Sequence, residues 1–103
     1  MKKKEIMIIV EDSGLTLEEL CDTCDISSDL IQDFIAYDII QPVGAIPEEW
    51  IFDLMQLQRI KTAIRLQSDL EVNLAGVAVI LDLMDEIEVL RRRTELLEKH
   101  FMK

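Results

Sequence analysis

Two cysteines of the chain, Cys21 and Cys24, form a Cys-x-x-Cys pattern, which occurs in redox pairs and in zinc sites. A redox pair is expected at a strand-to-helix junction, and a zinc site needs two further ligands. The single histidine, His100, lies at the far end of the chain. Because both cysteines also fall on the apolar side of a predicted helix, we interpret them as core residues and expect no metal and no cofactor.

Three carboxylates at helical spacing, Asp82, Asp85 and Glu86, form the other group with possible chemistry. The sequence contains no glycine-rich phosphate loop, and one remote histidine cannot activate a serine or cysteine nucleophile. Carboxylates of this kind in an acidic chain are typical of a solvated helix face. The sequence therefore predicts no catalytic residues and a protein that is not an enzyme.

Charge is distributed unevenly along the 103 residues, whose formal net charge is -10. The segment 5–58 contains thirteen Asp or Glu residues and neither Lys nor Arg, whereas 59–103 contains eight basic and eight acidic residues. An acidic block of this kind is informative about partners and solubility, not about fold. No apolar run approaches the roughly 20 residues that span a bilayer, and we expect a cytoplasmic protein.

Two short amphipathic helices are predicted in the acidic half, after a β-branched strand at 6–10. Thr16 and Glu19 form a capping-box pattern at the start of the first helix, and Ser27 or Ser28 is the expected cap of the second. The short break between them predicts a helix-turn-helix. The expected apolar sides consist of Leu17, Leu20, Cys21 and Cys24 in the first helix, and of Leu30, Ile31, Phe34 and Ile35 in the second.

The segment that follows is expected to complete a small domain. A loop at 41–49 leads to the apolar run 50–52, which we expect to pair with the N-terminal strand as a wing. Asp53 with Gln56 predicts the capped start of a third helix that runs to about Leu70. Its inward-facing residues are predicted to be Leu57, Ile60, Ala63 and Ile64.

A last helix is predicted from about Leu74, after a break at 71–73 in which Asn73 is the expected cap. A row that faces the domain consists of Val77, Leu81 and Met84. A second row forms a heptad seam of Ile80, Leu83, Ile87, Leu90, Thr94, Leu97 and Phe101, with Gly76 on the same line.

The length of this seam favours self-association, because it extends beyond any surface that the rest of the chain offers. We therefore predict a homodimer joined through Leu83, Ile87, Leu90, Leu97 and Phe101. The basic run 91–93 is interpreted as a solvated flank of the seam that pairs with Glu88, Glu95 and Glu98.

DNA binding by the helix-turn-helix would require Lys and Arg side chains that neutralise phosphates. The two helices offer carboxylates instead, which repel phosphate, so we predict no DNA binding by this half. Like charges four residues apart in a helix cost a few tenths of a kcal/mol per pair. Plain solvation is one reading of these acids; we prefer a docking surface for a basic protein, made of Glu18, Glu19, Asp22, Asp29 and Asp33.

From Trp50 to about Phe101 the chain resembles the chaperone-modulator family, the CbpM-like proteins, which are related to MerR-type winged helix-turn-helix regulators. The resemblance rests on the runs 50–53, 63–66, 69–70, 74–78 and 81–87, together with Arg59 and Leu90. Residues 1–49 share only the layout of a strand, two short helices and a loop.

The resemblance implies a mainly α fold, a MerR-like winged helix-turn-helix with a small two-stranded β element and a long C-terminal helix. We expect a domain at 1–72 and a helix for packing and dimerisation at 73–103. The implied function is binding to the J-domain of a DnaJ-like, CbpA-type co-chaperone, which blocks its stimulation of the chaperone DnaK. An acidic surface suits this role, because J-domains engage DnaK through a basic helix.

Two other functions remain open at the level of the sequence. One is a MerR-class DNA-binding transcription regulator that would use Arg59, Lys61, Arg65 or the basic run 91–93. The other is a small acidic inhibitor, similar to an antitoxin, whose target is an unrelated basic protein.

Overall fold

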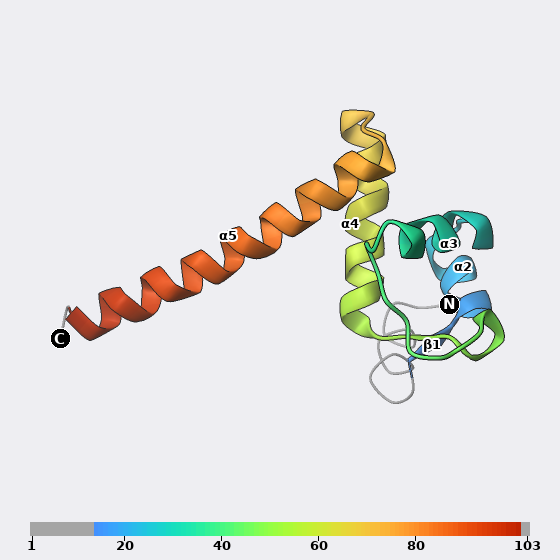
Figure 1. Ribbon diagram of the computed structural model, residues 1–103, viewed down its shortest axis with the longest axis horizontal. Coiled ribbons are helices and arrows are strands. Elements are labelled where there is room, and N and C mark those ends of the chain that lie inside the picture. Colours follow the sequence, from blue (N-terminus) through green and yellow to red (C-terminus); the bar gives the residue numbers. More distant parts are fainter. Residues whose placement is uncertain (1–13, 102–103) are drawn as a thin grey trace.

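The computed structural model describes residues 14–101, which form a small, mainly helical domain and a long projecting helix (Figure 1). The domain begins with strand β1 (Leu15–Thr16) and helices α2 (Leu17–Cys24) and α3 (Ser28–Ala36). A single 3-10 turn, η1 (Pro47–Glu49), precedes strand β2 (Ile51–Phe52) and helix α4 (Leu54–Leu70). Helix α5 (Leu74–Phe101) ends the described chain, so the predicted helix order and fold class are confirmed.

The wing is a two-stranded antiparallel sheet in which Leu15 pairs with Phe52 and Thr16 with Ile51. An isolated bridge from Val43 to Ile51 extends it by one residue. We predicted that the run 50–52 would pair with a strand at 6–10, a segment that lies outside the described residues. The described partner of β2 is the pair of residues just before α2, where Gly14 adopts a φ of 78° and lies against Ile51.

Local hydrogen bonds fix the starts of α2 and α3, as the sequence predicted. The Thr16 hydroxyl accepts from the Glu19 backbone N–H at 3.2 Å, and the Glu19 carboxylate accepts from the Thr16 N–H at 3.0 Å. The Ser27 hydroxyl accepts from the Leu30 N–H at 3.2 Å. Asp25 ends α2 in the left-handed region, with a φ of 55°, so that α3 can turn back across α2.

The core lies where α2, α3, β2, α4 and the first turns of α5 meet. Phe34 and Phe52 are its largest fully buried side chains, and Leu17, Cys21, Cys24, Leu30 and Ile35 pack against it while partly buried. The predicted inward residues of α4 are buried except Ile64, which is half-buried. The buried residues of the described part of the chain are Leu15, Leu20, Ile31, Phe34, Ile39, Ile40, Phe52, Leu57, Ile60, Ala63, Val77 and Leu81.

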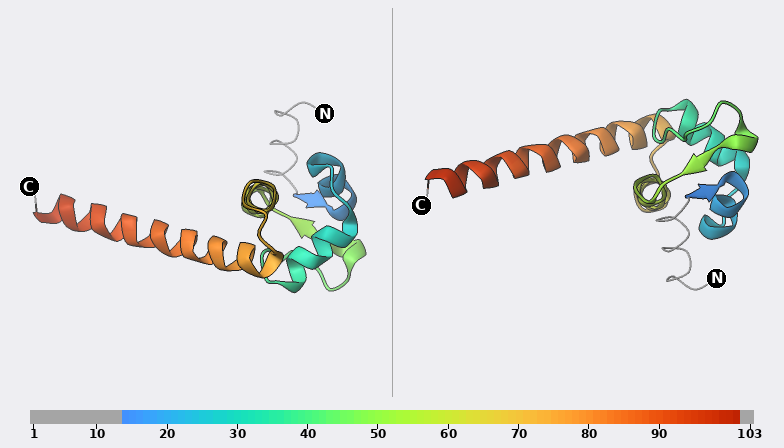
Figure 2. Two further views of the ribbon diagram at one scale, coloured as in Figure 1. Left: turned by 90° about the horizontal axis from the view of Figure 1, so that it is seen from above. Right: turned by 90° about the horizontal axis from the view of Figure 1, so that it is seen from below.

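Helix α4 begins with the predicted capping box, in which Asp53 accepts from the Gln56 N–H at 2.8 Å. Glu71 ends it in the left-handed region, and Asn73 then accepts from the Gly76 N–H at 2.8 Å at the start of α5. Only Val77 and Leu81 of α5 are buried, and every residue from Asp82 to Phe101 is exposed. The rest of α5 therefore projects away from the domain as a single arm, as both views in Figure 2 show.

Among residues 14–101, no helix is both long and apolar enough to cross a membrane.

Candidate partner-binding site

The acidic residues that we predicted to form a docking surface lie on the two helices of the helix-turn-helix. Glu18 and Asp22 on α2, and Asp29 and Asp33 on α3, are exposed. Glu19 is half-buried, and its carboxylate already closes the capping box with Thr16. No ion pair within the described part of the chain involves any of these five residues. Four free carboxylates therefore face solvent from adjacent helices.

The two cysteines are free and half-buried against the core, in agreement with our interpretation of the Cys-x-x-Cys pattern. Burial raises the pKa of the Cys21 thiol, and the carboxylate of Asp22 raises it further. Burial also raises the pKa of Cys24. A raised pKa lowers the fraction of reactive thiolate at both cysteines. Within 14–101, no three His, Cys, Asp or Glu residues gather as a metal site would need.

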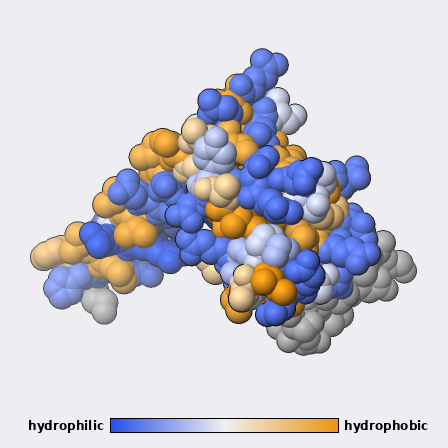
Figure 3. Space-filling model, turned by 45° about the vertical axis from the view of Figure 1, so that its right-hand side comes forward, coloured by the Kyte–Doolittle hydropathy of each residue, from blue (hydrophilic) through white to orange (hydrophobic). Residues whose placement is uncertain are grey.

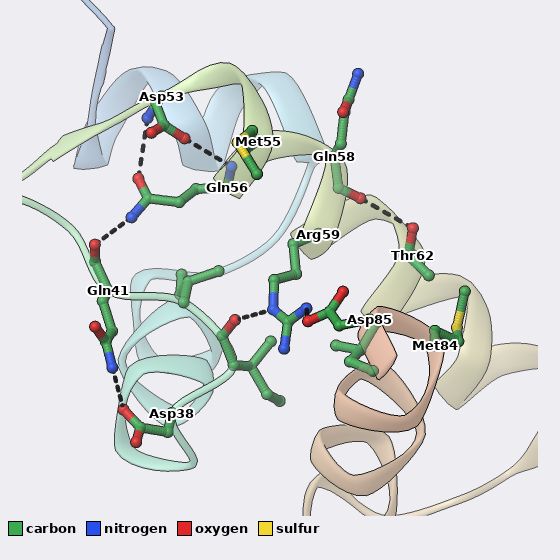
Figure 4. A pocket seen from close by; sticks show the side chains of 13 residues that line it. Asp38, Gln41, Asp53, Met55, Gln56, Gln58, Arg59, Thr62, Met84 and Asp85 are labelled. Carbon is green, nitrogen blue, oxygen red and sulfur yellow. Dashed lines mark hydrogen bonds and ion pairs between the residues drawn. The ribbon is translucent and has the colours of Figure 1, made fainter. Parts of the chain in front are cut away.

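A cleft of about 580 Å³ lies between the loop that follows α3, the first half of α4 and the start of α5's exposed part (Figure 4). The loop contributes Asp38 to Gln41, and α5 contributes Leu81, Met84 and Asp85. Helix α4 and its cap provide the remaining wall, with Asp53, Met55, Gln56, Gln58, Arg59 and Thr62.

Arg59 joins the three elements around this cleft. Its guanidinium donates to the Asp85 carboxylate at 2.8 Å and to the Asp82 carboxylate at 3.3 Å, and its Nε donates to the Ile39 carbonyl. Asp82 and Asp85 lie on a solvated face, as predicted, and the structure adds that both pair there with Arg59. The same contacts occupy the guanidinium that we considered for DNA, whereas Lys61 and Arg65 are exposed.

The cleft itself was not predicted from the sequence. We expected Met84 to face the domain, but 45% of its surface is exposed at the cleft. The partners of Arg59 are 23 and 26 residues away in sequence, beyond the reach of any local pattern. One feature of the sequence could have indicated this contact. Arg59, Asp82 and Asp85 all belong to the residues that carry the family resemblance.

The predicted dimerisation residues form an apolar stripe along the projecting arm of α5. Leu83, Ile87, Leu90 and Leu97 are about half exposed, and Phe101 is 78% exposed. Figure 3 shows hydrophobic and hydrophilic side chains interspersed along this arm. Arg92 pairs with Glu88 at 3.3 Å, which confirms one of the expected pairs beside the seam. No other described segment covers the stripe.

The helices α2 and α3, the wing of β1 and β2, and the long α5 define a protein of the MerR-type helix-turn-helix class. A model of the family described as MerR HTH family regulatory protein matches residues 15–99.

Curated proteins give a narrower relationship. A protein of Coxiella burnetii (strain Dugway 5J108-111) named chaperone modulatory protein CbpM is 37% identical over 93 residues, which cover 90% of this chain and 88% of that protein. A protein of Pseudomonas entomophila (strain L48) with the same name is 34% identical over 85 residues, which cover 82% of this chain and 84% of its own length. The chain therefore belongs to the CbpM family of chaperone modulatory proteins, within the MerR-type class.

Proposed function

We propose that this protein is a cytoplasmic, non-enzymatic adaptor that binds the J-domain of a CbpA-type, DnaJ-like co-chaperone. Binding would stop the co-chaperone from stimulating DnaK. Membership of a family whose curated members are named chaperone modulatory proteins supports a chaperone-related role. The resemblance noted from the sequence supports the J-domain as the partner.

The observation that carries this proposal is the charge of the helix-turn-helix. Helices α2 and α3 occupy the place of a DNA-reading pair but present Glu18, Asp22, Asp29 and Asp33 to solvent, with no Lys or Arg on either helix. A phosphate backbone would be repelled by such a surface. A basic helix of a J-domain complements it and would be attracted over distance.

The proposed mechanism is occlusion. A J-domain that contacts DnaK through basic side chains cannot offer the same side chains to DnaK while they face the carboxylates of α2 and α3. Electrostatic complementarity then sets the rate of encounter and the choice of partner, and apolar contacts supply the remaining affinity.

We further propose that the division of the chain at 72/73 is functional. The acidic surface of α2 and α3 within 1–72 would contact the partner, and the seam of α5 would join two copies through Leu83, Ile87, Leu90, Leu97 and Phe101. A dimer would present two acidic faces and could bind two J-domains.

The test is calorimetric titration of the purified protein with the J-domain of the co-chaperone from the same organism. The variant Asp29→Lys with Asp33→Lys should weaken binding by about tenfold or more, because two attractive contacts become repulsive. The control variant Asp69→Lys with Glu95→Lys makes the same change in net charge on exposed residues away from α2 and α3. Wild-type affinity should also fall with added salt.

Two outcomes contradict the proposal. One is the absence of measurable J-domain binding by the wild-type protein. The other is equal affinity of the two charge-reversal variants. If both bind more weakly than wild type, net charge is responsible; if both bind as wild type does, charge is not, and in neither case is the α2–α3 surface specific. Retardation of random duplex DNA at micromolar protein would support the alternative, a DNA-binding regulator that uses cations such as Lys61 and Arg65 on α4.

A further inference from the structure

Contacts within the chain join the walls of the cleft, which are the post-α3 loop, α4 and α5. The Gln56 side-chain amide donates to the Gln41 carbonyl, and Arg59 donates to the Ile39 carbonyl, so the loop is fixed against α4. Arg59 also holds Asp85 of α5 at 2.8 Å. The three walls are thus tied together, and an occupant would not have to order them first.

Apolar side chains line the cleft at two depths. Ile39, Ile40 and Leu81 are buried and form its base. Met55 on α4 and Met84 on α5 stand at its surface with 77% and 45% of their area exposed. Methionine is unbranched and polarisable, and exposed methionines adapt their shape to an apolar side chain that contacts them.

The polar lining of the cleft is negative. It contains the carboxylates of Asp38, Asp53 and Asp85 and one cation, Arg59, which is already paired with Asp82 and Asp85. Asp53 caps α4, and Asp38 accepts a hydrogen bond from the Gln41 amide at 2.9 Å. A cation that approached the rim would therefore meet uncompensated negative charge at Asp38.

The polar groups of the cleft are poorly suited to orient a small polar ligand. Its half-buried polar side chains already bond within the chain, since Gln56 donates to the Gln41 carbonyl, Arg59 to Ile39 and Asp85, and Thr62 to the Gln58 carbonyl. Specific small-molecule sites depend on a few converging polar groups that the ligand satisfies. An occupant of this cleft would instead gain from apolar contact with the methionines and from positive charge at its edges.

We propose that the cleft receives an anchor from the partner protein, an apolar side chain flanked by Lys or Arg in one surface segment. This inference rests on the proposed J-domain binding and adds a second contact to the acidic face of α2 and α3. The anchor packs against Met55 and Met84, which line the cleft, and a neighbouring cation lies beside Asp38. Apolar anchors in a preformed pocket carry a large share of the affinity of most protein interfaces.

The experiment observes the two thioether methyl groups directly. Protein labelled with 13C at the methionine methyls is titrated with the J-domain of the cognate co-chaperone, and the signals are assigned with Met55→Ala and Met84→Ala. Both signals should shift, with the same midpoint as calorimetric binding. Met55→Ala with Met84→Ala should raise the Kd about tenfold or more, as expected for an interface anchor.

Two matched controls separate this contact from general surface effects. Leu70→Ala with Leu96→Ala removes two exposed apolar side chains outside the cleft, and its Kd should stay within about twofold of wild type. Asp38→Asn keeps the left-handed backbone, which Asn tolerates, and keeps an oxygen for Gln41. It should weaken binding at low salt and match wild type at high salt.

Each result decides the proposal. J-domain binding that leaves the Met55 and Met84 signals unmoved would overturn the cleft contact and leave the proposed function standing. The same holds if the methionine double variant binds as tightly as the leucine control. Absence of any J-domain binding by the wild-type protein would overturn both proposals together.

Discussion

The domain and the arm of this molecule bury their apolar residues in different ways. Within the described residues 14–101, all twelve buried hydrophobic residues lie between Leu15 and Leu81. The arm beyond Leu81 has no buried residue, yet α5 carries nine of the fifteen exposed large hydrophobic side chains of the described chain. Charge differs as well, since the acidic block ends at Gln58 and the segment from Arg59 onward is neutral.

The domain buries its apolar residues within one chain, whereas the arm leaves its apolar stripe uncovered. The domain satisfies its caps, its sheet and its core within one chain, so its acidic surface is free for a partner. A solvated helix whose apolar stripe recurs every three or four residues is typical of one strand of a coiled coil. We expect the arm to reach its stable state only in contact with a second copy.

The largest effect is expected when charged residues replace apolar ones in the seam of α5. Ile87→Glu with Leu90→Glu should convert a dimer to a monomer at micromolar concentration, measured by light scattering after size-exclusion chromatography. Each Leu or Ile buried contributes about 1.5–3 kcal/mol, and a two-fold dimer would lose each side chain twice. Leu96→Glu, on an exposed position outside the seam, should leave the mass unchanged. A monomeric wild-type protein would refute the predicted dimer.

The next largest effect is expected in the domain core. Phe34→Ala should lower the free energy of unfolding by about 3–5 kcal/mol, because it removes a fully buried ring and leaves a cavity. Urea unfolding followed by far-UV circular dichroism gives this value. The same kind of truncation on the arm, Leu96→Ala, should change it by less than about 0.5 kcal/mol. Equal losses in the two variants would show that arm and domain are not distinct in packing.

The smallest expected losses in the free energy of unfolding come from removing the arginines of two sets of ion pairs. Arg59→Met breaks contacts from α4 to α5 and to the loop, and should cost about 1 kcal/mol, since Asp82 and Asp85 are 77% and 66% exposed and screened by solvent. Arg92→Met removes a single pair with Glu88 on the arm and should cost at most about 0.5 kcal/mol. Urea unfolding at low and high salt measures both. A larger loss for Arg92 would contradict the view that Arg59 joins the regions.

Much of the fold was predictable because its signals are local. Each capping side chain accepts a hydrogen bond from the backbone N–H three residues later, as seen at Thr16, Ser27 and Asp53. The starts of α2, α3 and α4 can therefore be predicted from short sequence patterns. The strand pairing was harder, since β1 and β2 have two residues each and lie more than 30 residues apart. The docking residues were predicted from charge alone, and the structure confirms that one of them, Glu19, also closes the predicted capping box.

The sequence by itself determined the helices, the acidic block and the apolar seam, because capping, periodicity and charge are properties of residues that are close along the chain. Only the tertiary structure decided that Arg59 binds Asp82 and Asp85, that Met55 and Met84 share a cleft, and that α5 leaves the domain after Leu81. These features depend on the angle at which α5 crosses α4. That angle is set by how Val77 and Leu81 pack into the common core, which no local pattern contains.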